Sequence, residues 1–146
     1  MLIGGLAANL HGSQVVTMDL DICYARERNN LERLVAALRS LHSRLRGAPA
    51  NVPFQLDAQT LEAGDSFTFI TDAGSLGCLG TPAGTQGFES LDANALDAKI
   101  HGVPVRVVAL ADLIRMKRAA GRPKDRLVLE DLGAVREELA NQEGAD

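Results

Sequence analysis

The fold of this chain is decided by its first 24 residues, MLIGGLAANLHGSQVVTMDLDICY. A short apolar run ends at Gly4-Gly5, and apolar residues then recur at helical spacing until Gly12. Thirteen residues separate Gly5 from Asp19, where Asp19 and Asp21 alternate with apolar neighbours at period two. This order predicts a strand, a glycine turn, a short helix and a second strand with both carboxylates on one face.

Asp19 and Asp21 are the candidate catalytic and metal-binding residues. Residues two apart on a strand have Cα atoms about 6.5–7 Å apart, so the two carboxylates repel each other unless a cation lies between them. Mg²⁺ prefers one or two protein carboxylates together with phosphate oxygens of a substrate. The pattern therefore predicts a Mg²⁺ site, while the same alternation is also found on solvated strand faces.

Glycines beside such a site have a second use. Gly4 and Gly5 are candidate nucleotide-binding residues, because glycines let the backbone approach a triphosphate and helix N–H groups face its negative charge. The alternative interpretation is an ordinary turn.

Periodicity in the rest of the chain predicts an α/β (α+β) fold, with a mixed sheet of about five strands and helices mainly on one face. We expect one domain over residues 1–140 and a disordered tail over residues 141–146. The expected later elements are a helix from Asn29 or Asn30 to Gly47, strands at 66–71 and 76–79, a hairpin over 95–108 with its connection at 101–104, and helices at 110–119 and 127–139.

Composition narrows the classes of function. The 146 residues are 46% hydrophobic and 23% charged, which is typical of a globular domain. The net charge of -4 argues against a general basic surface for nucleic acid. Cys23 and Cys78 lack metal-ligand spacing and are predicted to be free buried thiols, which fits a reducing compartment. No apolar run approaches the ~20 residues of a membrane span, so we expect a cytoplasmic protein with no membrane partner.

A basic segment near the C-terminus supplies the remaining candidates. Lys117, Arg122 and Lys124 are predicted to bind nucleotide, because a lysine contacts phosphate as a point charge and an arginine as a planar fork. Without the acidic pair, the same segment would be interpreted as the solvated side of a helix. Asp125 is predicted to cap a helix or to form an ion pair.

These segments together resemble the nucleotidyltransferase (polymerase beta-like) fold, and within it the minimal nucleotidyltransferases of the AbiEii-like type, which are associated with toxin–antitoxin pairs. The resemblance rests on Gly4-Gly5-Leu6-Ala7, His11-Gly12-Ser13, Thr17-x-Asp19-Leu20-Asp21, Gly74-x-Leu76 and the stretch from Asp112 to Asp125. It implies Mg²⁺-dependent transfer of a nucleotidyl group from an NTP to an RNA or protein acceptor. It also implies a cognate toxin or antitoxin as a partner.

The chain departs from that family at the strand Gly74-Ser75-Leu76-Gly77-Cys78-Leu79. Related sequences read Gly-Asp-Leu-Asp-Leu-Leu here, so Gly77 occupies the position where the resemblance implies a third carboxylate. That carboxylate would bind a second metal and help to remove a proton. The remaining candidates for a replacement acid are Asp72 and Asp97. Val16 also replaces an arginine that is frequent in the family.

Two functions remain open from the sequence. The first is a nucleotidyltransferase whose catalysis is impaired by Gly77, and the second is a non-catalytic module that binds nucleotide or a partner as an antitoxin or regulator. The family has a helix before the first strand, and the apolar flank of the Met1-Ile3 strand would be exposed without it. We therefore expect self-association as a homodimer.

Overall fold

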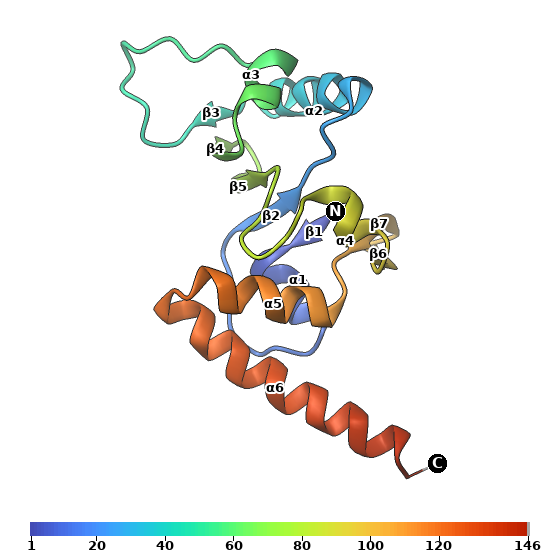
Figure 1. Ribbon diagram of the computed structural model, residues 1–146. Coiled ribbons are helices and arrows are strands. Elements are labelled where there is room, and N and C mark those ends of the chain that lie inside the picture. Colours follow the sequence, from blue (N-terminus) through green and yellow to red (C-terminus); the bar gives the residue numbers. More distant parts are fainter. Residues whose placement is uncertain (146) are drawn as a thin grey trace.

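A mixed sheet lies at the centre of the structure, a computed structural model that describes residues 1–145 (Figure 1). Its strands are β1 (Leu2–Ile3), β2 (Leu20–Cys23), β3 (Arg44–Leu45), β4 (Ser66–Thr71), β5 (Gly74–Leu79), β6 (Leu96–Ile100) and β7 (Val103–Val107). The order across the sheet is β3-β4-β5-β2-β1-β7-β6. The pairs β1/β7 and β2/β5 are parallel, and the other neighbours are antiparallel. The predicted mixed sheet is confirmed, with seven strands in place of about five.

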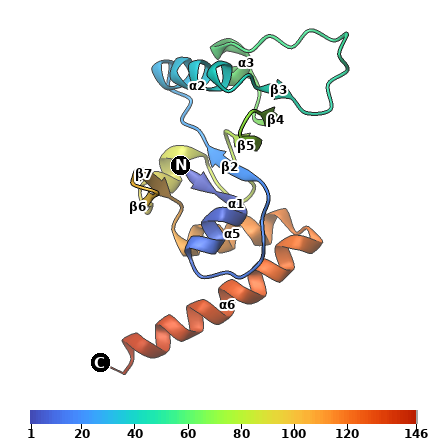
Figure 2. The ribbon, with the colours of Figure 1, turned by 180° about the vertical axis from the view of Figure 1, so that it is seen from behind.

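Helices cover both faces of this sheet. They are α1 (Gly4–Leu10), α2 (Arg28–Ser40), α3 (Ala58–Ala63), α4 (Phe88–Asp92), α5 (Leu110–Ala120) and α6 (Pro123–Glu143). In two opposite views, α2 and α3 lie on one side of the sheet and α5 and α6 on the other (Figures 1 and 2). The expectation of helices mainly on one face was wrong. Ile22 packs into the apolar cluster that contains α2 and α3 (the α2 cluster). Cys23 packs into the cluster that contains α1, α5 and α6 (the α5 cluster), so β2 is buried on both faces.

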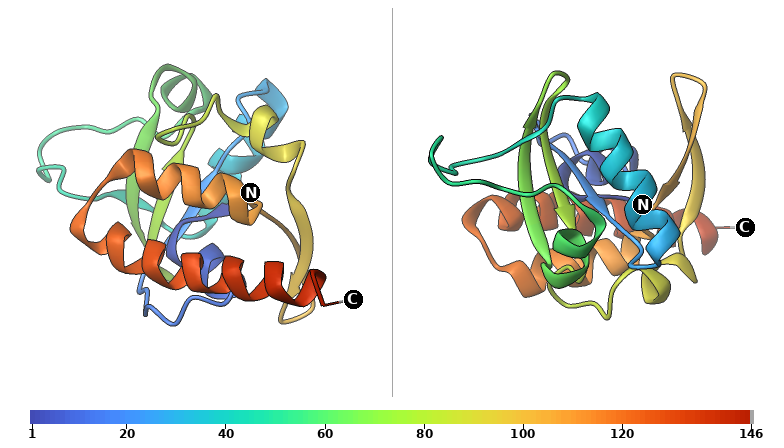
Figure 3. Two further views of the ribbon diagram at one scale, coloured as in Figure 1. Left: turned by 60° about the horizontal axis from the view of Figure 1, so that its bottom comes forward. Right: turned by 90° about the horizontal axis from the view of Figure 1, so that it is seen from above.

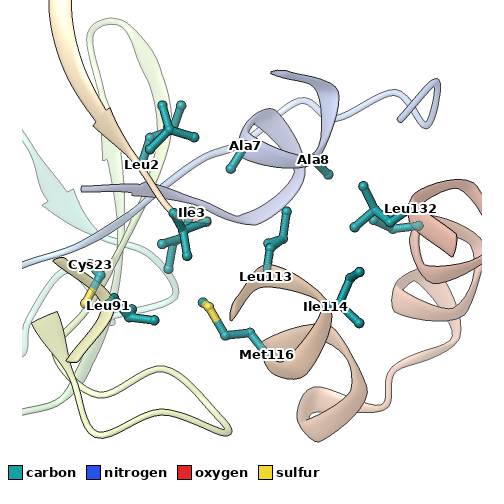
Figure 4. Close-up of a cluster of buried hydrophobic side chains, with 13 residues drawn as sticks. Leu2, Ile3, Ala7, Ala8, Cys23, Leu91, Leu113, Ile114, Met116 and Leu132 are labelled. Atoms are coloured by element: carbon teal, nitrogen blue, oxygen red, sulfur yellow. The ribbon is translucent and has the colours of Figure 1, made fainter. Parts of the chain in front are cut away.

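Each face has its own apolar core. On one side, Leu2, Ile3, Leu113 and Leu132 join β1 to α5 and α6, with Ala7 and Ala8 of α1 in the same cluster (Figure 4). On the other side, buried residues of α2 and α3 pack on Phe69 of β4. Because β1 is paired on both edges and Leu2 and Ile3 are buried, its flank is not exposed. The ground given for self-association is thus absent, and the homodimer stays a prediction.

The helix expected to reach Gly47 ends at Ser40 instead. His42 has a φ of 49°, which takes the chain out of the helix, and Leu45 then pairs with Phe69 as part of β3. Neither Asn29 nor Asn30 caps the helix, whose N-cap is Glu27. The apolar spacing continued beyond the helix because Leu45 faces the same core from a strand.

The C-terminal half follows the predicted order more closely. The hairpin of β6 and β7 turns at His101 and Gly102, both at positive φ. The observed connection is therefore shorter than the predicted one over 101–104, and Pro104 belongs to β7. Helices α5 and α6 lie side by side after a tight turn (Figure 3). Helix α6 begins earlier than predicted and includes residues 141–143 of the expected tail, whereas Asp146 lies outside the described residues. Within residues 1–145, the structure has no helix that is long and apolar enough to cross a membrane.

If α2 covers its face of the sheet as a core element, Leu31→Ala should lower the free energy of unfolding by about 3 kcal/mol, because it leaves a cavity at a side chain with 0% exposure. Leu127→Ala, at a side chain with 57% exposure, is the matched control and should change it by less than about 0.5 kcal/mol. Urea unfolding measures both, and equal effects would contradict this packing.

Candidate functional site

Asp21 lies in the middle of the sheet, on the face covered by α5. In β2 it is paired with Ile3 of β1 on one side and with Gly77 of β5 on the other. Cys23, two residues further on, packs into the α5 cluster, and alternation along the strand places Asp21 on the same face. Asp19 precedes the strand and is exposed.

Two glycines make room for the Asp21 carboxylate. Gly4 has a φ of 69°, and a Cβ there would lie 3.0 Å from Asp21 Cγ. A Cβ at Gly77 would overlap Asp21 Oδ1. Glycine is therefore required at position 4 by both backbone conformation and space. Gly5 serves a different contact, because a Cβ there would lie 2.7 Å from Thr17 Cβ and would push the segment before Asp19 away from α1.

The basic segment folds back over Asp21 through a turn between α5 and α6. Gly121, at a φ of 63°, ends α5 in the left-handed conformation that favours glycine. Asp125 in the first turn of α6 has 0% exposure and accepts hydrogen bonds from Lys117 Nζ at 2.9 Å and Arg122 Nε at 2.8 Å. It also accepts from the backbone N–H of Arg122 at 3.1 Å. We call Asp125, Lys117 and Arg122 the Asp125 ion-pair cluster.

The charges in this cluster reinforce one another. Burial alone would raise the pKa of Asp125, but the hydrogen bonds from Arg122 and Lys117 outweigh it and hold that pKa at about 2. The Asp125 carboxylate also raises the pKa of Arg122 through their hydrogen bond. Asp125 and Arg122 are therefore both ionised at neutral pH, and the Asp125 carboxylate fixes one nearly buried lysine and one half-exposed arginine.

A cavity of about 320 Å³ joins these two parts of the site. Its polar wall contains Asp21, Lys117 and Arg122, with Gly4 beside them. Its apolar wall is formed by Ile3, Leu79, Pro82, Ala83, Leu113, Met116 and Ala120. Ile3, Leu113 and Met116 lie together between β1 and α5 (Figure 4). The loop that carries Pro82 and Ala83 is attached to α5 by a hydrogen bond from Arg115 Nε to the Gly84 carbonyl, at 3.0 Å.

The electrostatics of Asp21 favour a bound cation. Burial raises the pKa of Asp21, and the neighbouring Asp19 carboxylate raises it further. The charges of Lys117, Lys124 and Arg122 lower the pKa of Asp21 in part. An ionised carboxylate that is destabilised by burial and by a like charge gains from a metal ion.

The predicted site residues are largely brought together. Gly4, Asp21, Lys117 and Arg122 line one cavity. Asp19, Lys124 and Gly5 are not among the residues that line it, although the charges of Asp19 and Lys124 act on Asp21. Asp125 was predicted to cap a helix or to form an ion pair, and it does both. Sequence reasoning missed the apolar wall, for which the only signal was the Gly80-Thr81-Pro82-Ala83-Gly84 turn.

Neither alternative acid completes the site. Asp72 lies in the β4–β5 turn, where it contacts His42 Nδ1 at 2.5 Å, and Asp97 lies on the edge strand β6 with Arg106. Within residues 1–145, no group of three or more His, Cys, Asp or Glu side chains is placed to hold a metal. A Mg²⁺ ion usually takes only one or two carboxylates from a protein and its remaining ligands from water and a phosphate substrate, so Asp19 and Asp21 stay the predicted ligands.

The other candidate groups are structural. His11 Nε2 lies 2.7 Å from the Val108 carbonyl and connects α1 to the end of β7. Burial raises the pKa of Cys23 to about 11 and that of Cys78 to about 12. Neither thiol is a nucleophile at neutral pH, as predicted for buried free cysteines.

Comparison with known proteins supports the fold. No family model matches the chain, and no curated protein matches it. Among solved structures, it is similar to the lincosamide antibiotic adenylyltransferase LnuA, crystallised with lincomycin bound. The TM-score is 0.58 at 11% sequence identity, over 92% of this chain and 85% of LnuA. The chain therefore has the nucleotidyltransferase fold, as the sequence resemblance predicted.

If the Asp125 ion-pair cluster holds α5 against α6, Asp125→Asn should lower the free energy of unfolding by about 3 kcal/mol at pH 7, because it leaves Lys117 buried without its anionic partner. A folded-state pKa of about 2, below the usual value of 3.8, adds stability above about pH 4 that is lost as the pH falls through 2. The wild type should thus lose about 2 kcal/mol more than the variant between about pH 5 and 2.

Urea unfolding at several pH values measures this difference. The control is Glu130→Gln, at an exposed acid on the same helix, which should behave as the wild type. Parallel pH profiles for wild type and Asp125→Asn would show that Asp125 has no such role.

Proposed function

We propose that the chain is a nucleotidyltransferase-type protein that binds a Mg²⁺-NTP complex in the Asp21 cavity and transfers the nucleotidyl group slowly to an acceptor hydroxyl. The single observation that carries this proposal is the meeting, in one cavity, of Asp21 with Lys117 and Arg122 from a segment about 100 residues later. An acidic metal site opposite two fixed cations is the arrangement that a triphosphate with its metal requires. The fold shared with LnuA supports the same class.

The residues take separate parts in binding. Asp19 and Asp21 hold the cation, which on binding offsets charge on the phosphates. Lys117 and Arg122 contact phosphate oxygens, and Asp125 keeps both in place before the substrate arrives. Gly4 lines the cavity next to Asp21, where its backbone can approach a phosphate closely. Lys124 adds charge at the margin of the cavity, and the apolar wall with Leu79, Pro82 and Met116 takes the base and sugar.

The transfer itself lacks one group. The acceptor oxygen forms a bond to the α-phosphorus while the bond to pyrophosphate breaks, and the hydroxyl proton has to leave. Gly77 is paired with Asp21 on the same face, where a third carboxylate would accept that proton. With glycine there, the proton passes to water, and the rate falls by the ~10²–10⁴-fold that general-base help supplies.

Gly77 equally supports the second candidate, a non-catalytic module that retains nucleotide binding and acts as an antitoxin or regulator. The resemblance to AbiEii-like proteins supports a cognate toxin or antitoxin partner, and the acceptor is then an RNA or a protein hydroxyl. LnuA is an adenylyltransferase for a lincosamide antibiotic. The two candidates bind NTP alike and differ in turnover.

Replacing both site acids, as Asp19→Asn with Asp21→Asn, should lower Mn²⁺ or Mg²⁺ affinity at least ~10-fold and leave the fold intact, because it removes the ligands together with their repulsion. Calorimetric titration measures the affinity. The control pair is Asp72→Asn with Asp97→Asn, at two acids outside the cavity. Equal metal binding by wild type and the Asp19/Asp21 variant would show a merely solvated strand face.

Gly77→Asp tests enzyme against binding module. It should raise transfer of radiolabelled nucleotide ~10²-fold or more, provided that the flexible tip of Asp21 turns away from the new Cβ. Gly77→Ala is the matched control, because it displaces Asp21 in the same way without adding a base. Fast wild-type turnover that is abolished by Asp21→Asn and unchanged by Gly77→Asp would contradict the impairment.

A further inference from the structure

Two exposed arginines stand on the same sheet face as Asp21, three strands away. Asp21 is paired with Gly77, and Gly77 is paired with Thr68 of β4. The next group in this row is Arg46, whose backbone N–H donates to the Thr68 carbonyl at 2.8 Å. Paired residues on neighbouring strands point to the same face, so Arg46 shares the face of Asp21.

The adjacent row of paired residues confirms that the arginines face the Asp21 side. Ser75 of β5 is paired with Ile70 of β4, and Ile70 with Arg44 of β3. The intervening Leu45 and Phe69 are paired and pack into the α2 cluster on the opposite face. Arg44 and Arg46 therefore both face the Asp21 side.

This part of the face is open. Ile70 is 43% exposed, although it is a large apolar residue within a sheet, and both arginines are exposed. The three atoms nearest to a Cβ built at Gly77 all belong to Asp21. We call Gly77, Thr68, Ile70, Arg44 and Arg46 the open strip. It runs from Asp21 over three strand spacings, or about 14 Å, to the arginines.

The charge of the open strip suits one kind of ligand. Within the described residues 1–145, neither Arg44 nor Arg46 takes part in a salt bridge. Two guanidinium groups without carboxylate partners, on a chain of net charge -4, form a local site for phosphates. Between them and Asp21 lie small or uncharged side chains that leave room for a polymer.

An RNA strand fits this spacing better than an acidic protein does. RNA carries a phosphate at every nucleotide, so a strand whose terminal hydroxyl reaches Asp21 necessarily presents phosphates further along the open strip, whatever its sequence. A protein acceptor would need acidic residues at one particular distance from its reacting hydroxyl.

Building on the proposed function, we propose that the open strip binds the end of an RNA acceptor, with its terminal hydroxyl at Asp21 and its upstream phosphates at Arg44 and Arg46. The acceptor then approaches across β5 and β4, and the NTP occupies the cavity under α5. The two substrates meet at Asp21 from opposite sides.

Binding is tested with a short fluorescein-labelled single-stranded RNA, without NTP or Mg²⁺, by anisotropy over a series of salt concentrations. Arg44→Ala with Arg46→Ala should weaken binding ~10-fold or more at low salt. It should also reduce the slope of log affinity against log salt by about 1.4, because each lost contact to single-stranded nucleic acid removes about 0.7. The control, Arg118→Ala with Arg136→Ala, loses the same charge from exposed positions on α5 and α6 and should bind as the wild type.

Unchanged binding by the Arg44/Arg46 variant, or an equal loss in the control, would overturn the proposal. A poly-glutamate peptide that binds more tightly than the RNA, and that no longer binds the Arg44/Arg46 variant, would also overturn it. Such a result would assign the open strip to an acidic protein. Thermal unfolding and NTP titration of each variant should match the wild type. Failure of NTP binding in the wild type would count against the proposed function alone, since the RNA titration contains no free NTP.

Discussion

The buried ion pairs of Asp125 are the interaction on which the site depends. A fully buried carboxylate is costly unless it is paired, and here one carboxylate is paired with Lys117 and Arg122 at once. That pairing joins the last turn of α5 to the first turn of α6. It also sets both cations at the edge of the Asp21 cavity before any ligand binds, so less ordering remains for the ligand to bring about.

A second constraint is space in the sheet, where the first residue of α1 and a glycine of β5 leave room for one side chain of β2. Asp21 is placed between Gly4 and Gly77, each of which has no room for a Cβ while the carboxylate holds its present position. The glycine at position 4 also needs its positive φ, whereas position 77 is an ordinary strand residue. Space for Asp21 is thus a structural reason for glycine at position 77, separate from any loss of catalysis. Asp21 faces the cavity under α5 on one side and the open strip on the other.

Much of the fold follows from local sequence. Turn chemistry and hydrophobic period are local properties, and they predicted the strand around Asp21, the β6–β7 hairpin and the glycine that ends α5. They also predicted the change from strand to helix at Gly4-Gly5, although these glycines are the first residues of α1 and not a separate turn. The end of α2 was wrong, since Leu45 continues the helical spacing by facing the same core from a strand. Helices on both faces of the sheet were not predicted. Asp21 interrupts the apolar run of β2, so the sequence of this strand does not show that it is buried on both faces.

The site was predicted in parts. Asp19, Asp21 and the basic segment stand out by residue type, and the resemblance to a family brought them together. They come together because the turn at Gly121 sets the direction of α6 relative to α5. Local sequence patterns do not predict that direction. The apolar wall and the open strip were not predicted from the sequence. The pairing of β5 with β2 brings the loop with Pro82 to the Asp21 cavity, and the pairing of β3, β4 and β5 puts Arg44 and Arg46 on the same sheet face as Asp21.

The most direct test of the central claim is a crystal structure of the chain with Mn²⁺ and a non-hydrolysable NTP analogue. Each of the four bases should be tried, and the metal located by its anomalous signal. The account predicts the metal at the Asp21 and Asp19 carboxylates and phosphate oxygens within hydrogen-bond distance of Lys117 Nζ or the Arg122 guanidinium. An analogue bound elsewhere, or metal density away from Asp21 while the cavity holds only water, would contradict it.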